Sequence, residues 1–317
     1  MIDTLFLILG SGSVGSLIGG LLTRKGYNVF MIGRAPHIVI TGANGLKIQG
    51  LIEKQVEPIN AGTFDYIYPI VEMLNEEINH IIVTTKAHQI QQAAEEILPI
   101  ICKHSTILSL QNGIGTEDIL KEIYPDNVVL RGITSIGVSR PKDGVVDYSG
   151  KGRTVIGGFN NNQEKEKAQE IVDALTNSGL PTELESNIQG AVFTKTIVNC
   201  ALNPLTAIHG VKNAEIYKQK TLHKKAIALA EEAWNVTKKL GIKLMVEDPI
   251  EFTLDVIKKT GDNTNSMLTD IRNKRKTEID FINGKIISFA EQMDIEVPHN
   301  KEVYKKVIAL ERAYLKS

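Results

Sequence analysis

The chain has 317 residues and a mass of 34.9 kDa, enough for two ordinary domains or one large α/β domain. Hydrophobic residues make up 42% of the sequence and charged residues 23%, a balance that excludes a disordered or collagen-like chain. The 36 basic and 37 acidic side chains leave a net charge of −1, so no overall field favours nucleic acid or an anionic membrane as a partner.

The apolar start of the chain predicts a strand, a turn and a helix. Residues 5–22 are nearly uncharged, but glycines and serines interrupt them and Asp3 precedes them in place of a basic cluster. Signal peptides have a positive start and an unbroken apolar centre, so we expect neither a signal peptide nor a membrane span here. Residues 4–9 have the length and composition of a central parallel strand that is covered on both faces.

The next elements alternate between strands and helices. The turn at residues 10–15 is followed by a helical pattern that ends at Gly26 and by a strand at 28–32. Residues 45–59 alternate loosely and predict an antiparallel excursion. Further along the chain the sequence predicts strands at 80–85, 105–110, 127–130 and 182–184, helices at 89–98 and 162–178, and a hairpin region at 132–158.

Strand signals nearly vanish after Ser186. We therefore expect an α/β fold with a Rossmann-type dinucleotide-binding domain at 1–186, followed by an all-helical domain at 187–317. The first helix of that domain covers residues 188–202, and Asn203-Pro204 is expected to end or kink it. Gly241 ends a long helix, and Asp248 with Pro249 begins another.

The turn has the GxGxxG pattern of dinucleotide-binding proteins. On its own this pattern is weak evidence, but here it follows a strand, opens a helix and precedes a second strand. Gly10 permits the tight turn, Gly12 lets the backbone approach a pyrophosphate, and Gly15 lets the helix pack on the strand. We expect Ser13 and Val14 at the helix start to join these glycines in the phosphate site. The alternative is a glycine turn without a ligand.

The end of the second strand favours NADP over NAD. An NAD site usually has an acidic residue there to bind the ribose hydroxyls, whereas this chain has Gly33-Arg34. An arginine suits the additional 2′-phosphate of NADP because it donates charge-assisted hydrogen bonds. The alternative is an ordinary exposed arginine.

Polar residues at two further strand ends and along one helix are candidates for the substrate site. Lys86 and Asn112 follow predicted strands, although either alone is equally well explained as a solvated loop residue. Lys195, Asn199 and Asn203 are spaced by four and share one helical face among apolar residues. That stripe lines either a cleft or plain solvent. Ser266 and Glu278 stand at predicted helix starts, where such residues usually cap their own helix.

Five motifs together resemble the ketopantoate reductase family. They are the GxGxxG turn, TTKA at 84–87, QNGIG at 111–115, KxxxNxxxNPLTA at 195–207 and SMLxDIRxxRxTEIDFING at 266–284. They are spread over most of the chain in the family's order, and the last two are far more specific than the glycine turn. Members of the family reduce 2-dehydropantoate to (R)-pantoate with NADPH, on the way to pantothenate and coenzyme A.

The resemblance assigns roles to the candidate residues. It implies that Gly10, Gly12, Ser13, Val14, Gly15, Arg34, Lys86, Asn112 and Glu278 form the cofactor-binding set. It also implies that Lys195 is the general acid, with Glu278 as its catalytic partner, and that Asn112, Asn199, Asn203 and Ser266 bind substrate together with Lys195. In one departure, this chain has Asn265-Ser266-Met267 where many members have Ser-Ser-Met. Lysine suits the assigned role because an ammonium stabilises the negative charge that develops on a ketone oxygen and can deliver the proton.

The resemblance leaves three functional hypotheses. The first is an NADPH-dependent ketopantoate reductase, the second is a related reductase of another 2-oxo acid, and the third is an NADP-sensing protein without turnover. Lys195 and Glu278 argue against the third. A small-molecule 2-oxo acid and NADP(H) are the expected partners, and the resemblance permits a homodimer through the helical domain. Two cysteines without a CxxC pair predict a reducing cytoplasmic location, and seven scattered histidines predict no metal site.

Overall fold

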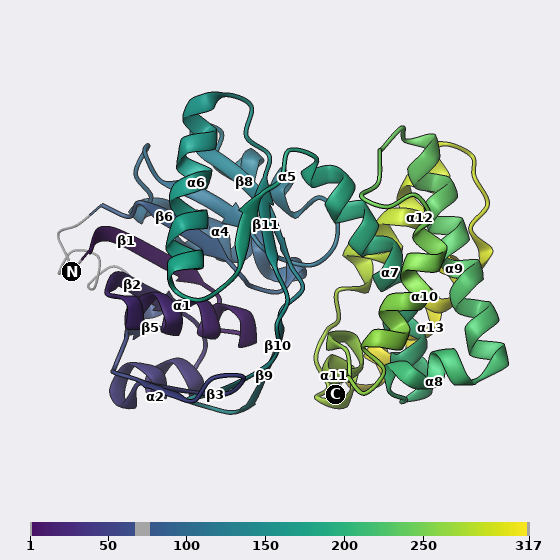
Figure 1. Ribbon diagram of the computed structural model, residues 1–317, viewed down its shortest axis with the longest axis horizontal. Helices are drawn as coiled ribbons and strands as arrows, with labels where there is room; N and C mark the ends of the chain where they lie inside the picture. Colours follow the sequence, from purple (N-terminus) through teal and green to yellow (C-terminus); the bar gives the residue numbers. More distant parts are fainter. Residues whose placement is uncertain (1, 67–76, 316–317) are drawn as a thin grey trace. The chain divides into compact units, whose positions relative to one another are not determined.

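The computed structural model describes residues 2–66 and 77–315, and the chain divides into two compact units (Figure 1). The first unit comprises residues 1–111 and 115–188, and the second comprises residues 112–114 and 189–317. A mainly parallel sheet with helices forms the first unit, and the described elements of the second are all helical. The predicted α/β class, with a Rossmann-type N-terminal part and a helical C-terminal part, is confirmed.

The first unit contains one large sheet and one small sheet. The large sheet has the strand order β12-β11-β8-β7-β6-β1-β2-β5, and all its neighbours are parallel except β8 and β11. The small sheet has the order β4-β3-β10-β9. The strands are β1 (Ile2–Leu9), β2 (Tyr27–Ile32), β3 (Leu46–Gly50), β4 (Lys54–Val56), β5 (Asn60–Gly62), β6 (His80–Val83), β7 (Thr106–Ser109), β8 (Val128–Thr134), β9 (Gly137–Lys142), β10 (Val145–Gly150), β11 (Thr154–Gly157) and β12 (Thr182–Leu184).

Apolar side chains on alternate positions of the central strands cover both faces of the large sheet. On β1, Phe6 and Ile8 belong to one buried cluster, while Leu5, Leu7 and Leu9 belong to another. The first cluster contains residues of α1 (Ser13–Lys25) and α6 (Asn162–Asn177), and the second contains residues of α4 (Ile90–Glu96) and α5 (Thr116–Ile123). Because successive side chains of a strand point to opposite faces, a continuous apolar run is what such a two-sided burial requires.

The remaining helical elements among the described residues of the first unit are short. They are α2 (His37–Asn44), η1 (Phe64–Tyr66), η2 (Ala87–Gln89) and η3 (Leu98–Ile100). The predicted end of the first long helix is confirmed, because Gly26 caps α1 in the left-handed conformation with φ of 100°. The predicted antiparallel excursion is also present as the β3–β4 pair. Its parallel pairing with β10, almost a hundred residues further along the chain, was not predicted.

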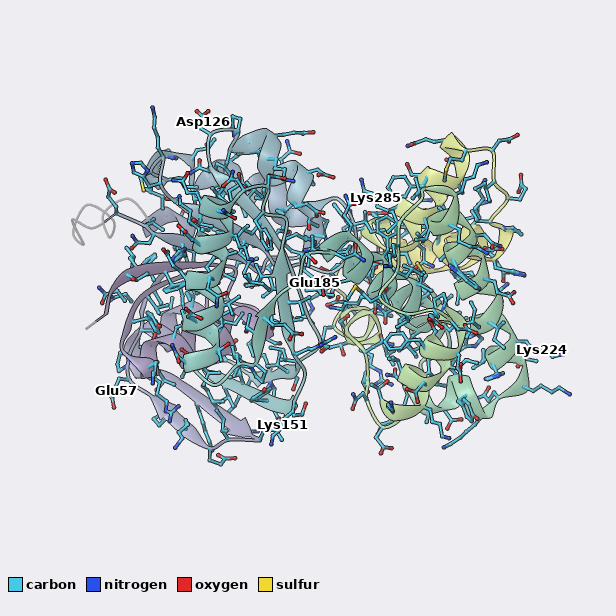
Figure 2. All side chains as sticks on the ribbon, turned by 45° about the horizontal axis from the view of Figure 1, so that its top comes forward. Glu57, Asp126, Lys151, Glu185, Lys224 and Lys285 are labelled. Carbon is cyan, nitrogen blue, oxygen red and sulfur yellow. The ribbon has the colours of Figure 1, made fainter. Side chains whose placement is uncertain are left out.

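The second unit is built on the long helix α7 (Ile188–His209). Its other elements are α8 (Asn213–Lys218), α9 (Lys220–Lys239), α10 (Pro249–Lys259), α11 (Ser266–Arg272), η4 (Ile279–Phe281), α12 (Asn283–Gln292) and α13 (Pro298–Leu315). The predicted cap of α10 is confirmed, because the Asp248 carboxylate accepts hydrogen bonds from the amides of Ile250 and Glu251. Charged side chains of both signs cover the surfaces of the two units, among them Glu57 and Lys224 (Figure 2).

The helix α7 does not end at Asn203-Pro204, so the prediction that it could end there is wrong. Pro204 lies inside the helix, which continues to His209. A proline has no N–H to donate to the carbonyl four residues earlier, which here belongs to Cys200. The side-chain amide of Asn283 donates to that carbonyl instead, at 3.1 Å, and it also donates to Asn300 Oδ1 at 2.9 Å. A buried partner from α12 therefore satisfies the group that the proline leaves unpaired.

A buried histidine joins three segments of the first unit. His37 is 1% exposed, its Nδ1 accepts from the amide of Gly144 at 3.0 Å, and its Nε2 lies 2.8 Å from Ser16 Oγ. Since Nδ1 accepts, Nε2 carries the proton and donates to Ser16, whose hydroxyl donates to the carbonyl of Ser11. Burial, with Arg140 nearby, lowers the pKa of His37 to about 4, while Asp143 acts in the opposite direction.

The stability of the first unit should therefore fall on the acid side. Between about pH 6.5 and pH 4 the unfolded chain binds a proton at His37 that the folded chain does not, so the free energy of unfolding drops as pH falls, by up to about 1.4 kcal/mol per pH unit. We expect His37→Gln to be less stable than wild type at pH 7 and to lose less stability on acidification. Urea denaturation of both proteins at pH 7, 5.5 and 4.5 measures this difference, and parallel pH dependences would contradict it.

Candidate functional site

The glycine turn fits the close approach of a ligand. Gly10 has φ of 108°, and a side chain there would strike the backbone of Thr84 and Thr85. A Cβ on Gly15 would lie far closer than 3.0 Å to the Gly10 carbonyl oxygen and the Thr84 hydroxyl, so this helix start packs directly on the end of β6. A Cβ on Gly12 would meet nothing within 4 Å. The space beside Gly12 is therefore open, as the pyrophosphate of a dinucleotide requires.

The start of α1 is also electrostatically suited to an anion. Ser13 and Val14 form its first turn, which contains no acidic residue, and no side chain caps its amides. The N-terminus of a helix carries a partial positive charge and directs amide N–H groups outward. The glycine turn and the start of α1 thus fit the phosphates of a nicotinamide dinucleotide.

Arg34 and Lys86 follow the strands on either side of this turn. Arg34 is exposed two residues after β2, and the intervening Gly33 packs against the Ser11 side chain of the glycine turn. Lys86 is half-buried and precedes η2, at the carboxyl end of β6. Because β1, β2 and β6 are parallel neighbours, their carboxyl ends lie at the same edge of the sheet.

The QNGIG loop (residues 111–115) passes from the first unit into the second and back. Gly113 and Gly115 both have positive φ, of 93° and 82°. A Cβ on Gly113 would lie 2.5 Å from the Phe281 carbonyl oxygen, which also accepts a hydrogen bond from the amide of Ile114 at 2.9 Å. The motif requires glycine at these positions because the backbone takes a left-handed conformation and approaches η4 closely.

Asn112 joins Lys195 and Glu278 in one hydrogen-bonded chain. The Lys195 ammonium donates to Asn112 Oδ1 at 2.9 Å, and Asn112 Nδ2 donates to Glu278 Oε2 at 3.2 Å. Glu278 is 5% exposed, while Lys195 and Asn112 are half-buried. Three residues that are widely separated in the sequence thus place a cation, an amide and a carboxylate together in the second unit. A structured arrangement of this kind can deliver a proton and bind a polar substrate.

The other predicted substrate residues also lie in the second unit. Asn199 and Asn203 continue the α7 face that begins at Lys195, with Asn199 half-buried and Asn203 5% exposed. Ser266 is exposed at the first position of α11, and the preceding Asn265 caps that helix through a hydrogen bond to the Leu268 amide.

Sequence reasoning missed two arginines that contact predicted site segments. Arg140 on β9 donates to the Ser11 carbonyl of the glycine turn at 3.3 Å. Arg131 on β8 donates to the Gln111 carbonyl, directly before Asn112, at 2.9 Å. The first contact joins residues that are 129 positions apart, and the second joins residues that are 20 positions apart. No short spacing in the sequence therefore indicates either contact.

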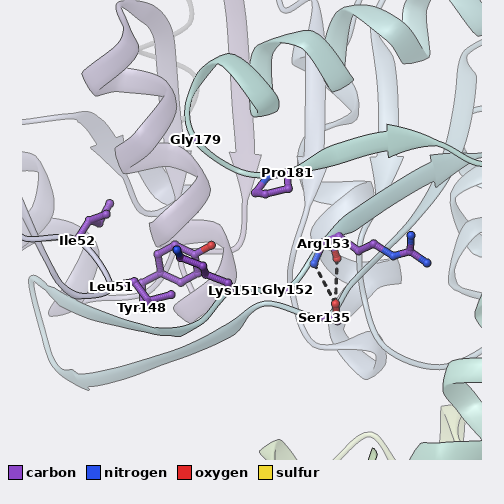
Figure 3. Close-up of a pocket in the computed structure, with 9 residues that line it drawn as sticks. All are labelled: Leu51, Ile52, Ser135, Tyr148, Lys151, Gly152, Arg153, Gly179 and Pro181. Atoms are coloured by element: carbon purple, nitrogen blue, oxygen red, sulfur yellow. Dashed lines mark hydrogen bonds between the residues drawn. The ribbon is translucent and has the colours of Figure 1, made fainter. Parts of the chain in front are cut away.

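A hollow of about 700 Å³ in the first unit contains none of the predicted site residues (Figure 3). Leu51, Ile52, Tyr148 and Pro181 supply much of its apolar lining. Two of its polar side chains are already engaged, because Ser135 exchanges hydrogen bonds with the backbone of Arg153, whose guanidinium pairs with Glu183 at 2.7 Å. This hollow is therefore unlike the open polar turn at Gly12.

The described residues offer neither a metal site nor a helix that could span a membrane. Within residues 2–66 and 77–315, no cluster of three histidine, cysteine, aspartate or glutamate side chains is arranged to hold a metal ion. In the same part of the chain, each helix is too short or too polar to span a membrane.

Comparison with known proteins identifies the family. The model of "Ketopantoate reductase PanE/ApbA" matches residues 6–161, and its C-terminal counterpart matches residues 187–311. The 2-dehydropantoate 2-reductase of Pyrococcus horikoshii is 36% identical over 293 residues, which cover 92% of this chain and 93% of the relative. The fold and these matches define an oxidoreductase that acts on a CH–OH group. More narrowly, the chain belongs to the ketopantoate reductase family, whose members use NADPH.

Solved structures of two kinds of enzyme resemble the chain closely. A PanE/ApbA family ketopantoate reductase from Ralstonia eutropha has a TM-score of 0.88 at 25% identity and covers 98% of this chain and 100% of its own. D-mandelate dehydrogenase, solved with NADH and anilino(oxo)acetate, has a TM-score of 0.89 at 28% identity with the same coverage. The fold therefore occurs in reductases that differ in both substrate and nicotinamide cofactor.

Proposed function

We propose that this chain reduces 2-dehydropantoate to (R)-pantoate with NADPH, as one step toward pantothenate and coenzyme A. The observation that carries the proposal is the hydrogen-bonded chain of Lys195, Asn112 and Glu278. The 2-dehydropantoate 2-reductases among its relatives support the choice of substrate. When bound, NADPH supplies the hydride; the protein residues bind, orient and protonate.

Lys195 is the proposed general acid. Negative charge develops on the ketone oxygen during reduction, and an ammonium stabilises that charge before it gives up its proton. The Asn112 amide oxygen accepts from the ammonium at 2.9 Å and thereby fixes the direction of its remaining N–H bonds. A lysine held in this way donates without first losing the freedom of its flexible side chain.

Glu278 is the proposed partner carboxylate. Its Oε2 accepts a hydrogen bond from Asn112 Nδ2, and the carboxylate is proposed to accept a further hydrogen bond from a hydroxyl of the substrate. Burial favours such a role because a carboxylate that is 5% exposed forms stronger hydrogen bonds than one in water. Asn199, Asn203 and Ser266 are proposed to bind the remaining polar groups of the 2-oxo acid.

The proposed cofactor site consists of Gly10, Gly12, Ser13, Val14 and Gly15 with Arg34 and Lys86, and Asn112 and Glu278 are proposed to contact the cofactor as well. The residues 1–186 form the proposed NADP-binding domain, and the residues 187–317 the substrate and dimerisation domain. We also propose a cytoplasmic location and a homodimer.

Arg34 should determine the preference for NADPH over NADH. Losing one charge-assisted contact to the 2′-phosphate costs about 1.5–3 kcal/mol, so Arg34→Ala should weaken NADPH binding roughly tenfold or more and leave NADH binding nearly unchanged. Fluorescence titration of the protein with each cofactor measures the two dissociation constants. An equal loss for both would show that Arg34 does not bind the 2′-phosphate.

A second candidate function is the reduction of another 2-oxo acid. The similarity to D-mandelate dehydrogenase favours it, because that protein has nearly the same fold at 28% identity and was solved with NADH. A carboxylate at Glu278 favours 2-dehydropantoate over this alternative, since the substrate of a mandelate dehydrogenase offers no further hydroxyl for it to bind.

An assay of NADPH oxidation by the purified protein tests the proposal. The assay is run with 2-dehydropantoate and, separately, with each of a set of other 2-oxo acids. We expect 2-dehydropantoate-dependent oxidation with (R)-pantoate as the product. Turnover of a different 2-oxo acid alone would support the second candidate. NADPH binding without any turnover would support a sensing protein instead.

A further inference from the structure

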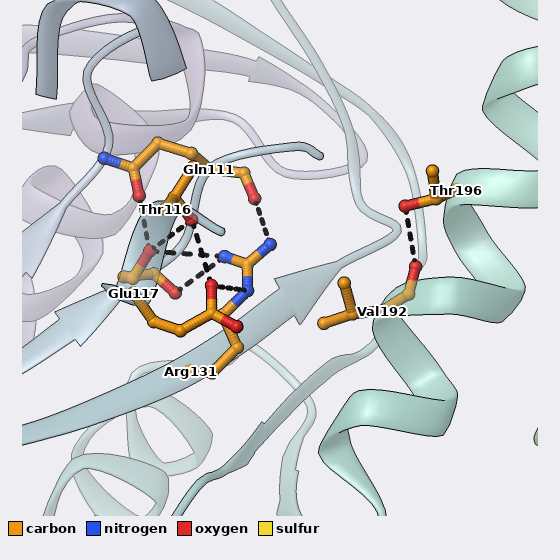
Figure 4. A network of polar contacts seen from close by, with 7 residues as sticks. Gln111, Thr116, Glu117, Arg131, Val192 and Thr196 are labelled. Carbon is orange, nitrogen blue, oxygen red and sulfur yellow. Dashed lines mark hydrogen bonds and ion pairs between the residues drawn. The ribbon is translucent and has the colours of Figure 1, made fainter. Parts of the chain in front are cut away.

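A buried arginine holds the backbone directly before Asn112. Arg131 lies on β8 and its side chain is 3% exposed (Figure 4). One guanidinium nitrogen donates to the Gln111 carbonyl at 2.9 Å, and the other terminal nitrogen donates to the carbonyl and hydroxyl of Ser109 at 3.2 and 3.3 Å. The fixed fork of an arginine thus joins the end of β7 to the start of the QNGIG loop.

The counter-charge of this arginine comes from the other end of the same loop. Glu117 lies in the first turn of α5, directly after the QNGIG loop and Thr116, and its Oε2 is 3.3 Å from Arg131 Nε. Its side chain is 16% exposed. A buried arginine is retained at a considerable desolvation cost, which its ion pair and hydrogen bonds must offset. Arg131 and Glu117 therefore clamp the two ends of the QNGIG loop.

The hydroxyl groups around the clamp complete the network. Ser109 Oγ donates to the Gln111 side-chain oxygen at 2.8 Å and lies 2.8 Å from Thr116 Oγ1. The Gln111 amide in turn donates to Thr85 Oγ1 at 3.4 Å. The backbone carbonyl and the side chain of Gln111 are thereby both held. Because the peptide bond is planar, only the φ rotation of Asn112 separates this carbonyl from the Cβ of Asn112.

We propose that Arg131, with Glu117 as its counter-charge, is a positioning residue that acts through Asn112 on the Lys195–Asn112–Glu278 chain. Through its hydrogen bond to the Gln111 carbonyl, Arg131 fixes the backbone from which Asn112 projects. This inference rests on the proposed function for its consequence in catalysis. The geometric part, that Arg131 orders the QNGIG loop, stands independently of the substrate.

The kinetic test uses Arg131→Met together with Glu117→Met, so that no carboxylate is left without its counter-charge. At saturating NADPH and 2-dehydropantoate, kcat should fall by about tenfold or more, since a misplaced catalytic group costs this order or more. If Arg131 acts through Asn112, adding Asn112→Ala to this pair should lower kcat no further than Asn112→Ala alone. The matched control is Arg153→Met, which removes an exposed arginine paired with Glu183 and should leave kcat unchanged.

A second measurement does not depend on turnover. Hydrogen exchange, followed by mass spectrometry of peptides that span residues 111–116, should show at least about tenfold faster exchange of the Ile114 amide in the paired variant and no change in Arg153→Met. Unchanged exchange would overturn the proposal. A triple variant whose kcat is lower than that of Asn112→Ala by the full factor lost in the paired variant would also overturn it. If wild-type protein does not turn over 2-dehydropantoate, the proposed function fails and the exchange result alone decides on the clamp.

Discussion

Replacing Lys195 by alanine should lower kcat by about 10²–10⁴-fold, the usual contribution of a general acid, or about 3–5 kcal/mol of barrier. The ammonium is the cation of the bonded chain with Asn112 and Glu278, so its loss removes both the proton and the charge that stabilises the alkoxide. The affinity for NADPH should stay near the wild-type value. Steady-state kinetics at saturating cofactor, with the dissociation constant of NADPH measured separately, distinguish the two effects.

Two further variants make this result specific to Lys195. Lys195→Arg keeps a charge but holds its proton too tightly, so it should restore little activity. Lys224→Ala removes an exposed lysine from α9 of the same unit and should leave kcat unchanged. Near-normal turnover of a folded Lys195→Ala protein would show instead that Lys195 is a solvated residue of an amphipathic helix.

Replacing Gly15 by alanine should damage both the fold and the cofactor site. The added Cβ would overlap with the Gly10 carbonyl oxygen and the Thr84 hydroxyl, so the helix start must move away from β6. Overpacking of this kind destabilises proteins by about 1–3 kcal/mol or more. We expect a lower melting temperature together with NADPH affinity weakened about tenfold or more, since the amides of the first turn move with the helix.

Gly12→Ala is the matched control because a Cβ there meets no protein atom within 4 Å and φ is −70°. Its stability should stay within about 1 kcal/mol of wild type, the usual cost of alanine at a helix N-cap. NADPH affinity should nevertheless fall, since the methyl group occupies the space left open for the pyrophosphate. Wild-type NADPH affinity in Gly12→Ala would show that the phosphates do not approach the turn at this residue.

The sequence predicted the features of the fold that depend on local patterns. The apolar run of β1 and the helix stop at Gly26 each have a cause within a few residues, which is why they could be identified. The parallel pairing of β3 with β10 and the continuation of α7 through Pro204 have long-range causes. In the second case Asn283, which lies 83 residues beyond the Cys200 carbonyl, supplies the missing hydrogen bond.

The candidate site also contains features that the sequence could predict and features that it could not. The stripe of Lys195, Asn199 and Asn203 follows from helical spacing, whereas the roles of Asn112 and Glu278 beside Lys195 came only from the resemblance to a family. The contacts of His37, Arg131 and Arg140 could not be predicted, because they connect a side chain to a backbone group that carries no signal in the sequence. Such supporting residues become recognisable once the three-dimensional arrangement is known.

The ratio of kcat/KM values for 2-dehydropantoate and phenylglyoxylate, the 2-oxo acid that corresponds to mandelate, tests the central claim most directly. The measurement uses wild-type protein with NADPH and repeats both substrates with Glu278→Ala. We predict that wild type prefers 2-dehydropantoate by about 100-fold or more, and that Glu278→Ala loses most of this preference, since a site that hydrogen-bonds a substrate hydroxyl discriminates strongly against an analogue without it. Equal or reversed preference in wild type would contradict the account and assign the chain to reduction of another 2-oxo acid.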